Sequence, residues 1–260
     1  MTIHFSCTQC GKCCHNLRLP LSLAEAAAWL RRGGDIALFC EAIPWPVEPP
    51  DTDAQAMHKR RLSFPVMSGT LPIRVVITVV ATFDGACPNL QSDGRCGAYE
   101  ERPRVCRIYP AEVNPFIPLT PVSKACPPEA WDEAKPVFFT DGRIVDVETT
   151  EVIHASRSAA ARDALVKQYL CAWLGVSRAA LANEGYVVYA FARGVMLEAL
   201  ERVEGIERND MPALPASEWQ FVSNRRATVD ALSSIEARYA VPSSLTETHV
   251  RYMEFFATDL

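Results

Sequence analysis

The pattern of hydrophobic and polar positions predicts a helix, a linker and a strand in the first part of the chain. Residues 22–32 begin with the Ser-x-x-Glu spacing of a capping box, continue in Ala and Leu, and precede two glycines, which favours a capped helix. Residues 43–50 contain four prolines and predict an extended linker. Residues 73–83 are rich in β-branched side chains, which favour a strand.

The second half of the chain combines a hairpin signal with helical periodicity. Residues 137–140 and 143–147 flank Asp141-Gly142, which suits a tight primed turn because that turn needs a positive φ. Beyond residue 155 the hydrophobic period becomes helical. One helix face is formed by Leu165, Tyr169, Leu170 and Trp173, ahead of Gly175, and another by Val188, Phe191, Val195 and Ala199. Further helices are expected around residues 217–237 and 244–257, the second beginning with another Ser-x-x-Glu pair.

Composition divides the chain near residue 136. Nine of the ten cysteines and most of the prolines lie before this point. We therefore predict an α+β fold with two domains. Residues 1–135 form an irregular cysteine-rich metal-binding domain with a few strands, and residues 136–260 form a hairpin followed by a mostly α-helical domain of unknown role. A protein partner or substrate would bind through this helical half.

Charge and hydropathy define the broad class of protein. The 260 residues are 49% hydrophobic, which supplies ample material for a core. The formal net charge of -5 argues against generic binding to nucleic acid or anionic membranes. Neither a signal-peptide pattern nor an apolar run long enough to cross a bilayer is evident. We expect a cytoplasmic protein that binds no nucleic acid and no membrane. In that compartment clustered thiols stay reduced and more often bind metals than form disulfides.

Four cysteines near the N-terminus form a C-x2-C-x2-C-C motif, which comprises Cys7, Cys10, Cys13 and Cys14. Two-residue spacings allow successive thiolates to turn onto one metal. The first three also match the opening of a bacterial ferredoxin cluster motif, and no H-x3-5-H pair follows as in a zinc finger. Because adjacent side chains usually point in different directions, the doubled cysteine indicates two centres or one polynuclear cluster.

Four more cysteines follow in a second group, which comprises Cys87, Cys96, Cys106 and Cys126. Eight thiolates are enough for two four-thiolate sites, but the number alone does not establish them. Arg102 and Arg107 bracket Cys106 and are candidates to offset the charge of a thiolate-rich cofactor and donate hydrogen bonds to it.

The remaining candidate residues have weaker support. Cys40 and Cys171 lack a motif and are expected to be buried structural thiols. His4 and His15 flank the first motif, but the thiolates suffice without them. Tyr99 and Tyr109 are expected to pack within the cysteine region.

The spacing of these cysteines and their neighbours resembles that of the YkgJ-type cysteine cluster proteins, also called CxxCxxCC or zinc- or iron-chelating domain proteins. The resemblance rests on Phe5-x-Cys-x-x-Cys-Gly-Lys-Cys-Cys, Cys87-Pro-x-Leu, Asp93-Gly-x-Cys and Tyr99-Glu-x-Arg-Pro-x-x-Cys-Arg-x-Tyr-Pro110, and covers roughly residues 5–127. It implies that all eight motif cysteines chelate metal. Flagellin lysine N-methylases carry a similar cysteine motif and are linked with an iron–sulfur cluster.

Three functions are compatible with this pattern. A metal-binding or electron-transfer module needs only the thiolates. A cluster-containing modifying enzyme, for example a protein methyltransferase, would bind its substrate in the helical half. A zinc-stabilised protein-interaction module would use the metal for folding alone. Cys-only ligation suits iron and zinc alike. The ferredoxin-like triplet, the Cys-Pro pairs and the methylase resemblance favour an iron–sulfur cluster over zinc. No catalytic residue can be assigned.

Overall fold

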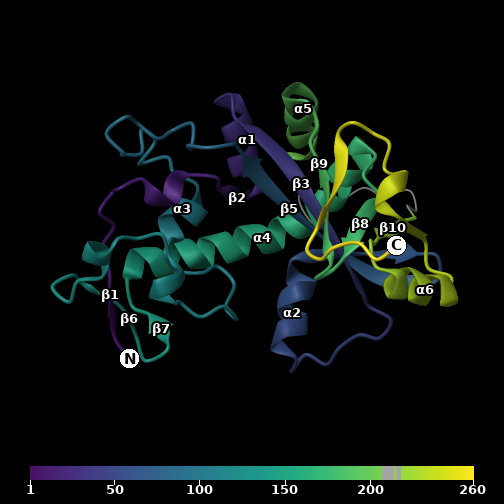
Figure 1. The fold of residues 1–260 in the computed structure, drawn as a ribbon, viewed down its shortest axis with the longest axis horizontal. Helices are drawn as coiled ribbons and strands as arrows, with labels where there is room; N and C mark the ends of the chain where they lie inside the picture. Colours follow the sequence, from purple (N-terminus) through teal and green to yellow (C-terminus); the bar gives the residue numbers. More distant parts are fainter. Residues whose placement is uncertain (207–213, 215–217) are drawn as a thin grey trace. The chain divides into compact units, whose positions relative to one another are not determined.

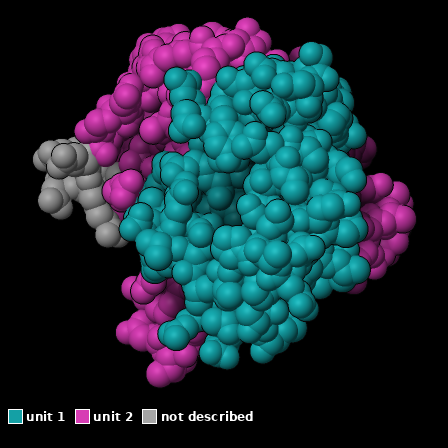
Figure 2. Space-filling view, turned by 90° about the vertical axis from the view of Figure 1, so that its left-hand side faces the viewer, with its two compact units in different colours: residues 1–21, 81–159 teal, residues 22–80, 160–260 magenta. Residues whose placement is uncertain are grey.

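The computed structural model describes residues 1–206, 214 and 218–260, and these divide into two compact units. Unit 1 comprises Met1–Leu21 and Ala81–Ala159, and unit 2 comprises Ser22–Val80 and Ala160–Leu260. Each unit is assembled from two separate stretches of the chain, and in Figure 2 the two stretches of unit 1 form one continuous teal body. Helices and strands are mixed throughout, so the predicted α+β class is confirmed.

Unit 1 is built mainly from short elements joined by irregular segments (Figure 1). They are β1 (Ile3–His4), η1 (Lys12–Cys14), β2 (Arg18–Leu21), α3 (Arg104–Ile108), η2 (Pro121–Ser123), η3 (Pro128–Trp131), β6 (Val137–Thr140), β7 (Arg143–Ile144) and the first part of α4 (Val147–Leu174). Strands β1, β6 and β7 form a small antiparallel sheet. The predicted hairpin is confirmed, with φ of 51° at Asp141 and 79° at Gly142.

The core of unit 1 anchors the segments that carry cysteines. Phe5, two residues before Cys7, packs against Trp131 and Phe138 with ring centroids 4.8 Å and 5.2 Å apart. Ile108, two residues after Cys106, is 1% exposed in the same cluster. Because apolar burial stabilises these anchors, the irregular loops between them have fixed ends.

Unit 2 contains a larger mixed sheet with helices. Its elements are α1 (Leu23–Arg31), β3 (Asp35–Pro44), α2 (Ala54–Arg61), β4 (Ser63–Ser68), most of β5 (Leu71–Thr82), the second part of α4, β8 (Arg178–Leu181), β9 (Gly185–Tyr189), α5 (Arg193–Val203), β10 (Gln220–Val222), α6 (Arg226–Ser234), β11 (Tyr239–Ala240), η4 (Pro242–Ser244) and β12 (Val250–Glu254). Within it the strand order is β11-β10-β8-β3-β5. Strand β4 pairs with β5, and β9 pairs with both β3 and β12. No described helix is both long enough and apolar enough to cross a membrane.

Local sequence signals correctly placed several of these elements. Helix α1 has the predicted capping box: the Ser22 hydroxyl accepts from the Glu25 amide, and the Glu25 carboxylate accepts from the Ser22 amide. Strand β5 covers the β-branched segment, and α4 ends at Leu174, just before Gly175. The proline-rich linker is expected over residues 43–50, but β3 continues to Pro44 before the regular structure ends.

Three predicted helices are wrong in whole or in part. The segment expected to carry Val188 on a helix begins as strand β9, and α5 starts only at Arg193. Its run Val187–Tyr189 is buried continuously, and such short apolar runs fit a buried strand as well as a helix. The helix expected over 217–237 is split into β10 and α6, and its first residue lies outside the described residues.

The helix expected over residues 244–257 is instead strand β12, which pairs antiparallel with β9. Its proposed cap does not form, because Ser244 ends η4 and Glu247 pairs with Arg178. Pairing with a strand far away in the sequence therefore overrides a local capping signal.

Candidate metal centre

The first cysteine motif turns at a glycine that no other residue could replace without strain. Gly11 has φ of 68°, and Cys14 N–H donates to its carbonyl oxygen at 2.9 Å. A Cβ added at Gly11 would lie 2.6 Å from the carbonyl oxygen of Gly94 and 2.9 Å from the Leu90 side chain. The glycine therefore allows the loop carrying Cys96 to pack directly against the first motif.

Main-chain hydrogen bonds join the second cysteine group to the first. The Cys87 amide donates to the carbonyl oxygen of Cys14 at 2.7 Å. In the loop that follows, the Gly97 amide donates a hydrogen bond to the Asn89 carbonyl oxygen at 2.7 Å. This turn brings Cys96 opposite Leu90. These contacts hold Cys87 and Cys96 beside the doubled cysteine.

The last two cysteines of the second group are positioned by α3 and by a turn. Cys106 lies within α3, and Tyr109 follows directly after that helix. The Tyr109 hydroxyl accepts from the Ala125 amide at 2.7 Å and also hydrogen-bonds the Cys126 thiol. Tyr109, expected from the sequence to be a packing residue, therefore also contacts a motif cysteine, and no local sequence pattern signals this contact.

Burial keeps several of these thiols protonated. It raises the pKa of Cys14 and of Cys106 to about 12, and neighbouring thiols add to the effect. Burial also raises the pKa of Cys13, Cys87 and Cys126. A metal that binds these sulfurs must therefore displace protons.

Comparison with known proteins finds a family model that matches the cysteine-rich part of the chain. Residues 6–127 match the family model CxxCxxCC, described as a putative zinc- or iron-chelating domain. We use the name CxxCxxCC domain for residues 6–127, which are similar to this family over slightly less than half of the chain. The match begins just before Cys7 and ends just after Cys126, so it includes all eight motif cysteines. No curated protein and no solved structure matches the chain.

The donor chemistry of the CxxCxxCC domain fits zinc or iron. All ten cysteines of the chain are free thiols, and the eight in the motifs lie in unit 1. Thiolate is a ligand for both metals, in zinc sites and in iron–sulfur clusters alike. Among the described residues, no three His, Cys, Asp or Glu side chains already converge closely enough to hold an ion.

Two arginines of the CxxCxxCC domain lie near Cys106 but have different partners. The Arg102 guanidinium lies 3.6 Å from the centre of the Tyr99 ring and acts to lower the pKa of Cys106. Arg107 pairs with Glu148 at 3.1 Å. Arg102 thus retains an electrostatic effect on a motif cysteine, whereas the charge of Arg107 is offset by a carboxylate.

The residues outside the motifs have other partners. His4 Nδ1 lies 2.7 Å from the carbonyl oxygen of Lys135. His15 Nδ1 lies 3.2 Å from the carbonyl oxygen of Gly11. Cys40 and Cys171 are both buried in unit 2. These two cysteines are therefore in a different unit from the eight candidate ligands.

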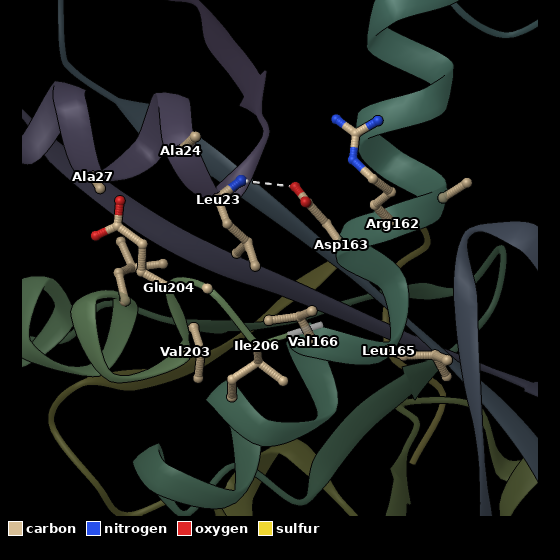
Figure 3. Close-up of a pocket in the computed structure, with 13 residues that line it drawn as sticks. Leu23, Ala24, Ala27, Arg162, Asp163, Leu165, Val166, Val203, Glu204 and Ile206 are labelled. Carbon is tan, nitrogen blue, oxygen red and sulfur yellow. Dashed lines mark hydrogen bonds between the residues drawn. The ribbon is translucent and has the colours of Figure 1, made fainter. Parts of the chain in front are cut away.

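Unit 2 contains a cavity of about 610 Å³ (Figure 3). Its lining is largely aliphatic and comes from α1, α4, α5 and the residues just after α5. At its edge the Asp163 carboxylate accepts from the Leu23 amide at 2.8 Å, as the dashed line in Figure 3 shows. This volume lies in the range of small-molecule sites.

Proposed function

We propose that the CxxCxxCC domain holds an iron–sulfur cluster through clustered cysteine thiolates, with zinc as the alternative metal. The proposed ligands are Cys7, Cys10, Cys13, Cys14, Cys87, Cys96, Cys106 and Cys126. The supporting observation is that each of these thiols lies close enough to another to influence its ionisation. They come from distant parts of the sequence, yet all lie in unit 1.

Iron is favoured over zinc by the ligand pattern. The first three cysteines have ferredoxin-like spacing, and Cys87 and Cys126 each precede a proline. When bound, a cluster would supply electron transfer or structural stabilisation. The protein residues hold it by thiolate ligation, and Arg102 offsets part of the negative charge. Free thiols in this number suit a reducing compartment, so we place the protein in the cytoplasm.

Elemental analysis and visible absorption of anaerobically purified protein test this proposal. Iron with acid-labile sulfide and a broad brown absorbance would establish a cluster. Colourless protein with stoichiometric zinc would establish the alternative. Cys10→Ser should lower metal content, whereas Cys171→Ala, a change in unit 2, should leave it unchanged. Equal metal content in wild type and Cys10→Ser would contradict the ligand assignment.

The cavity of unit 2 supports a second candidate function, that of a cluster-containing modifying enzyme. It offers apolar walls, with Arg162, Asp163 and Glu204 among its lining residues, and such a combination can hold and orient a small molecule. Native mass spectrometry of the purified protein tests this function. A small molecule that is lost on enlarging Ala27 to Phe would favour the enzyme, and a ligand-free protein would favour the metal module alone.

A further inference from the structure

The consecutive cysteines Cys13 and Cys14 have different sets of neighbours. Cys13 hydrogen-bonds Cys14 and lies within electrostatic range of three further thiols, those of Cys126, Cys7 and Cys10. Cys14 lies within electrostatic range of Cys13 and of two other thiols, those of Cys87 and Cys96. Cys106 is a neighbour of both cysteines, whereas Cys126, Cys7 and Cys10 neighbour Cys13, and Cys87 and Cys96 neighbour Cys14.

The backbone supports the first grouping independently. Ser6, directly before Cys7, donates its amide hydrogen to the Ala130 carbonyl oxygen at 2.9 Å. Ala130 in turn donates to Pro127, directly after Cys126, at 3.0 Å. Cys126 is thereby held beside the start of the first motif, and the thiols that influence it most among the cysteines are Cys7 and Cys10.

The backbone also supports the second grouping. The hydrogen bond from Cys87 to Cys14 and the pairing of Leu90 with Cys96 hold three thiols in one region. Cys106 joins them from α3, since Cys87 and then Cys14 are the thiols that interact with it most strongly. Cys13 has a smaller effect on Cys106, as expected for the direct neighbour of Cys14.

We propose that the CxxCxxCC domain contains two separate four-thiolate centres that meet at the Cys13-Cys14 peptide bond. The first consists of Cys7, Cys10, Cys13 and Cys126, and the second consists of Cys14, Cys87, Cys96 and Cys106. This inference rests on the proposed metal-binding function and specifies how the ligands are divided. Four thiolates complete the coordination of one zinc ion or one small iron–sulfur cluster, so each set suffices by itself.

Zinc added to metal-free, reduced protein tests the division, whichever metal is native. Three variants each remove two thiols. Cys7→Ser/Cys126→Ser affects only the first set, Cys87→Ser/Cys96→Ser affects only the second, and Cys7→Ser/Cys87→Ser takes one thiol from each. Zinc equivalents per chain are measured by competition with a chromophoric chelator. We expect two zinc equivalents in wild type and one in each variant that loses both thiols from one set. The variant that loses one thiol from each set (the cross-set variant) should bind no zinc with wild-type affinity.

The outcomes separate failure of the division from failure of the proposed function. Wild type that binds no zinc and contains no iron would refute metal binding itself. One polynuclear centre would make all three variants lose metal alike, and this result would overturn the division while leaving metal binding intact. Retention of one high-affinity zinc by the cross-set variant would also overturn the division.

A single substitution that keeps every thiol provides a second test, because loss of two ligands can unfold a metal-dependent domain. Tyr109→Phe removes the hydroxyl that contacts Cys126. The zinc affinity of one site should fall about tenfold or more, because a ligand loses its hydrogen-bonding partner. The affinity of the other site should not change. Tyr99→Phe is the matched control and should change neither. Equal weakening of both equivalents by Tyr109→Phe would overturn the division.

Discussion

The amide of Cys87 donates a hydrogen bond to the carbonyl oxygen of Cys14, with 2.7 Å between nitrogen and oxygen. One main-chain contact thus fixes the second cysteine group against the first. The neighbouring Asn16 amide donates to the Gly85 carbonyl oxygen at 2.7 Å, and the Gly85 amide donates to the Asn16 side chain at 2.9 Å. These bonds do not depend on the cysteine side chains, so the two segments can remain together when a thiol is replaced.

Close packing at Gly11 predicts that Gly11→Ala will impair metal binding. The new Cβ would lie 2.6 Å from the Gly94 carbonyl oxygen, so the loop that carries Cys96 must move away. We expect a loss of metal content and a free energy of unfolding lower by about 1–3 kcal/mol or more. Metal analysis and thermal unfolding measure the two effects.

Gly142→Ala is the matched control for Gly11→Ala. Gly142 also has a positive φ, of 79°, but a Cβ there meets no atom within 4 Å. Gly142→Ala should therefore lower the free energy of unfolding only through the strained backbone conformation, and it should retain full metal content. If the two variants retain equal metal, the contact between Gly11 and Gly94 is not needed for the centre.

The raised thiol pKa values predict that metal affinity increases with pH. Because the pKa of both Cys14 and Cys106 is about 12, these thiols are protonated in the metal-free protein at neutral pH. Each must lose its proton on binding, so affinity should rise about tenfold per pH unit for each proton released. Zinc competition from about pH 6 to about pH 8 measures the slope, and a pH-independent affinity would contradict thiolate ligation by these residues.

Buried Lys167 predicts a substitution that stabilises unit 2. Lys167 lies in α4 and is 7% exposed, and burial lowers its pKa although Asp163 and Cys171 act in the opposite direction. Lys167→Met removes the cost of burying the charge, and the Asp163 carboxylate keeps its hydrogen bond from the Leu23 amide. The free energy of unfolding should therefore rise by about 1 kcal/mol or more. Chemical denaturation at neutral pH measures the gain. Arg251→Met, at an exposed position of β12, is the control and should have little effect.

The gain from Lys167→Met should depend on pH in a defined direction. A lowered pKa means that the folded protein loses the Lys167 proton at a lower pH than the unfolded chain does. The penalty in wild type is therefore complete at low and neutral pH and fades as pH rises toward about 10.4, the ordinary value for lysine. A gain that grew toward alkaline pH would show that the amine is not the source of the cost.

The capping box of α1 predicts a local loss of stability for Ser22→Ala. The hydroxyl of Ser22 accepts from the Glu25 amide at 3.3 Å, and it also donates to the Glu25 carboxylate at 2.7 Å. Its removal should lower the free energy of unfolding by about 1 kcal/mol. Ser22→Thr retains the oxygen and should lose less, and denaturant titration compares the two variants. If Ser22→Ala and Ser22→Thr lower the free energy of unfolding equally, the effect comes from packing and not from the hydrogen bonds of the hydroxyl.

Features with local chemical causes could be predicted from the sequence. The caps of α1, the β-branched run of β5 and the Asp141-Gly142 turn each depend on residues that are near each other in the chain. The eight candidate ligands were also identified locally, because their spacing is itself the signal. The helix expected over residues 244–257 failed because pairing of β12 with β9 depends on residues far apart in the sequence.

The internal arrangement of the candidate site could not be predicted for the same reason. The sequence shows that Cys13 and Cys14 are adjacent, but only the folded chain determines which thiols surround each of them. The role of the Tyr109 hydroxyl likewise depends on the return of the chain at Ala125. Long-range contacts of this kind have no periodicity and no local motif.

The composition of unit 1 from Met1–Leu21 and Ala81–Ala159 has a consequence for biosynthesis. The ribosome releases the first cysteine motif well before Cys126 exists. At about 5–20 residues per second, the intervening chain takes on the order of ten seconds to synthesise. During that interval the nascent chain exposes thiols whose proposed co-ligands have not yet been translated. Neither proposed four-thiolate set can be completed until its last cysteine emerges, so full coordination in either set must follow elongation through this region.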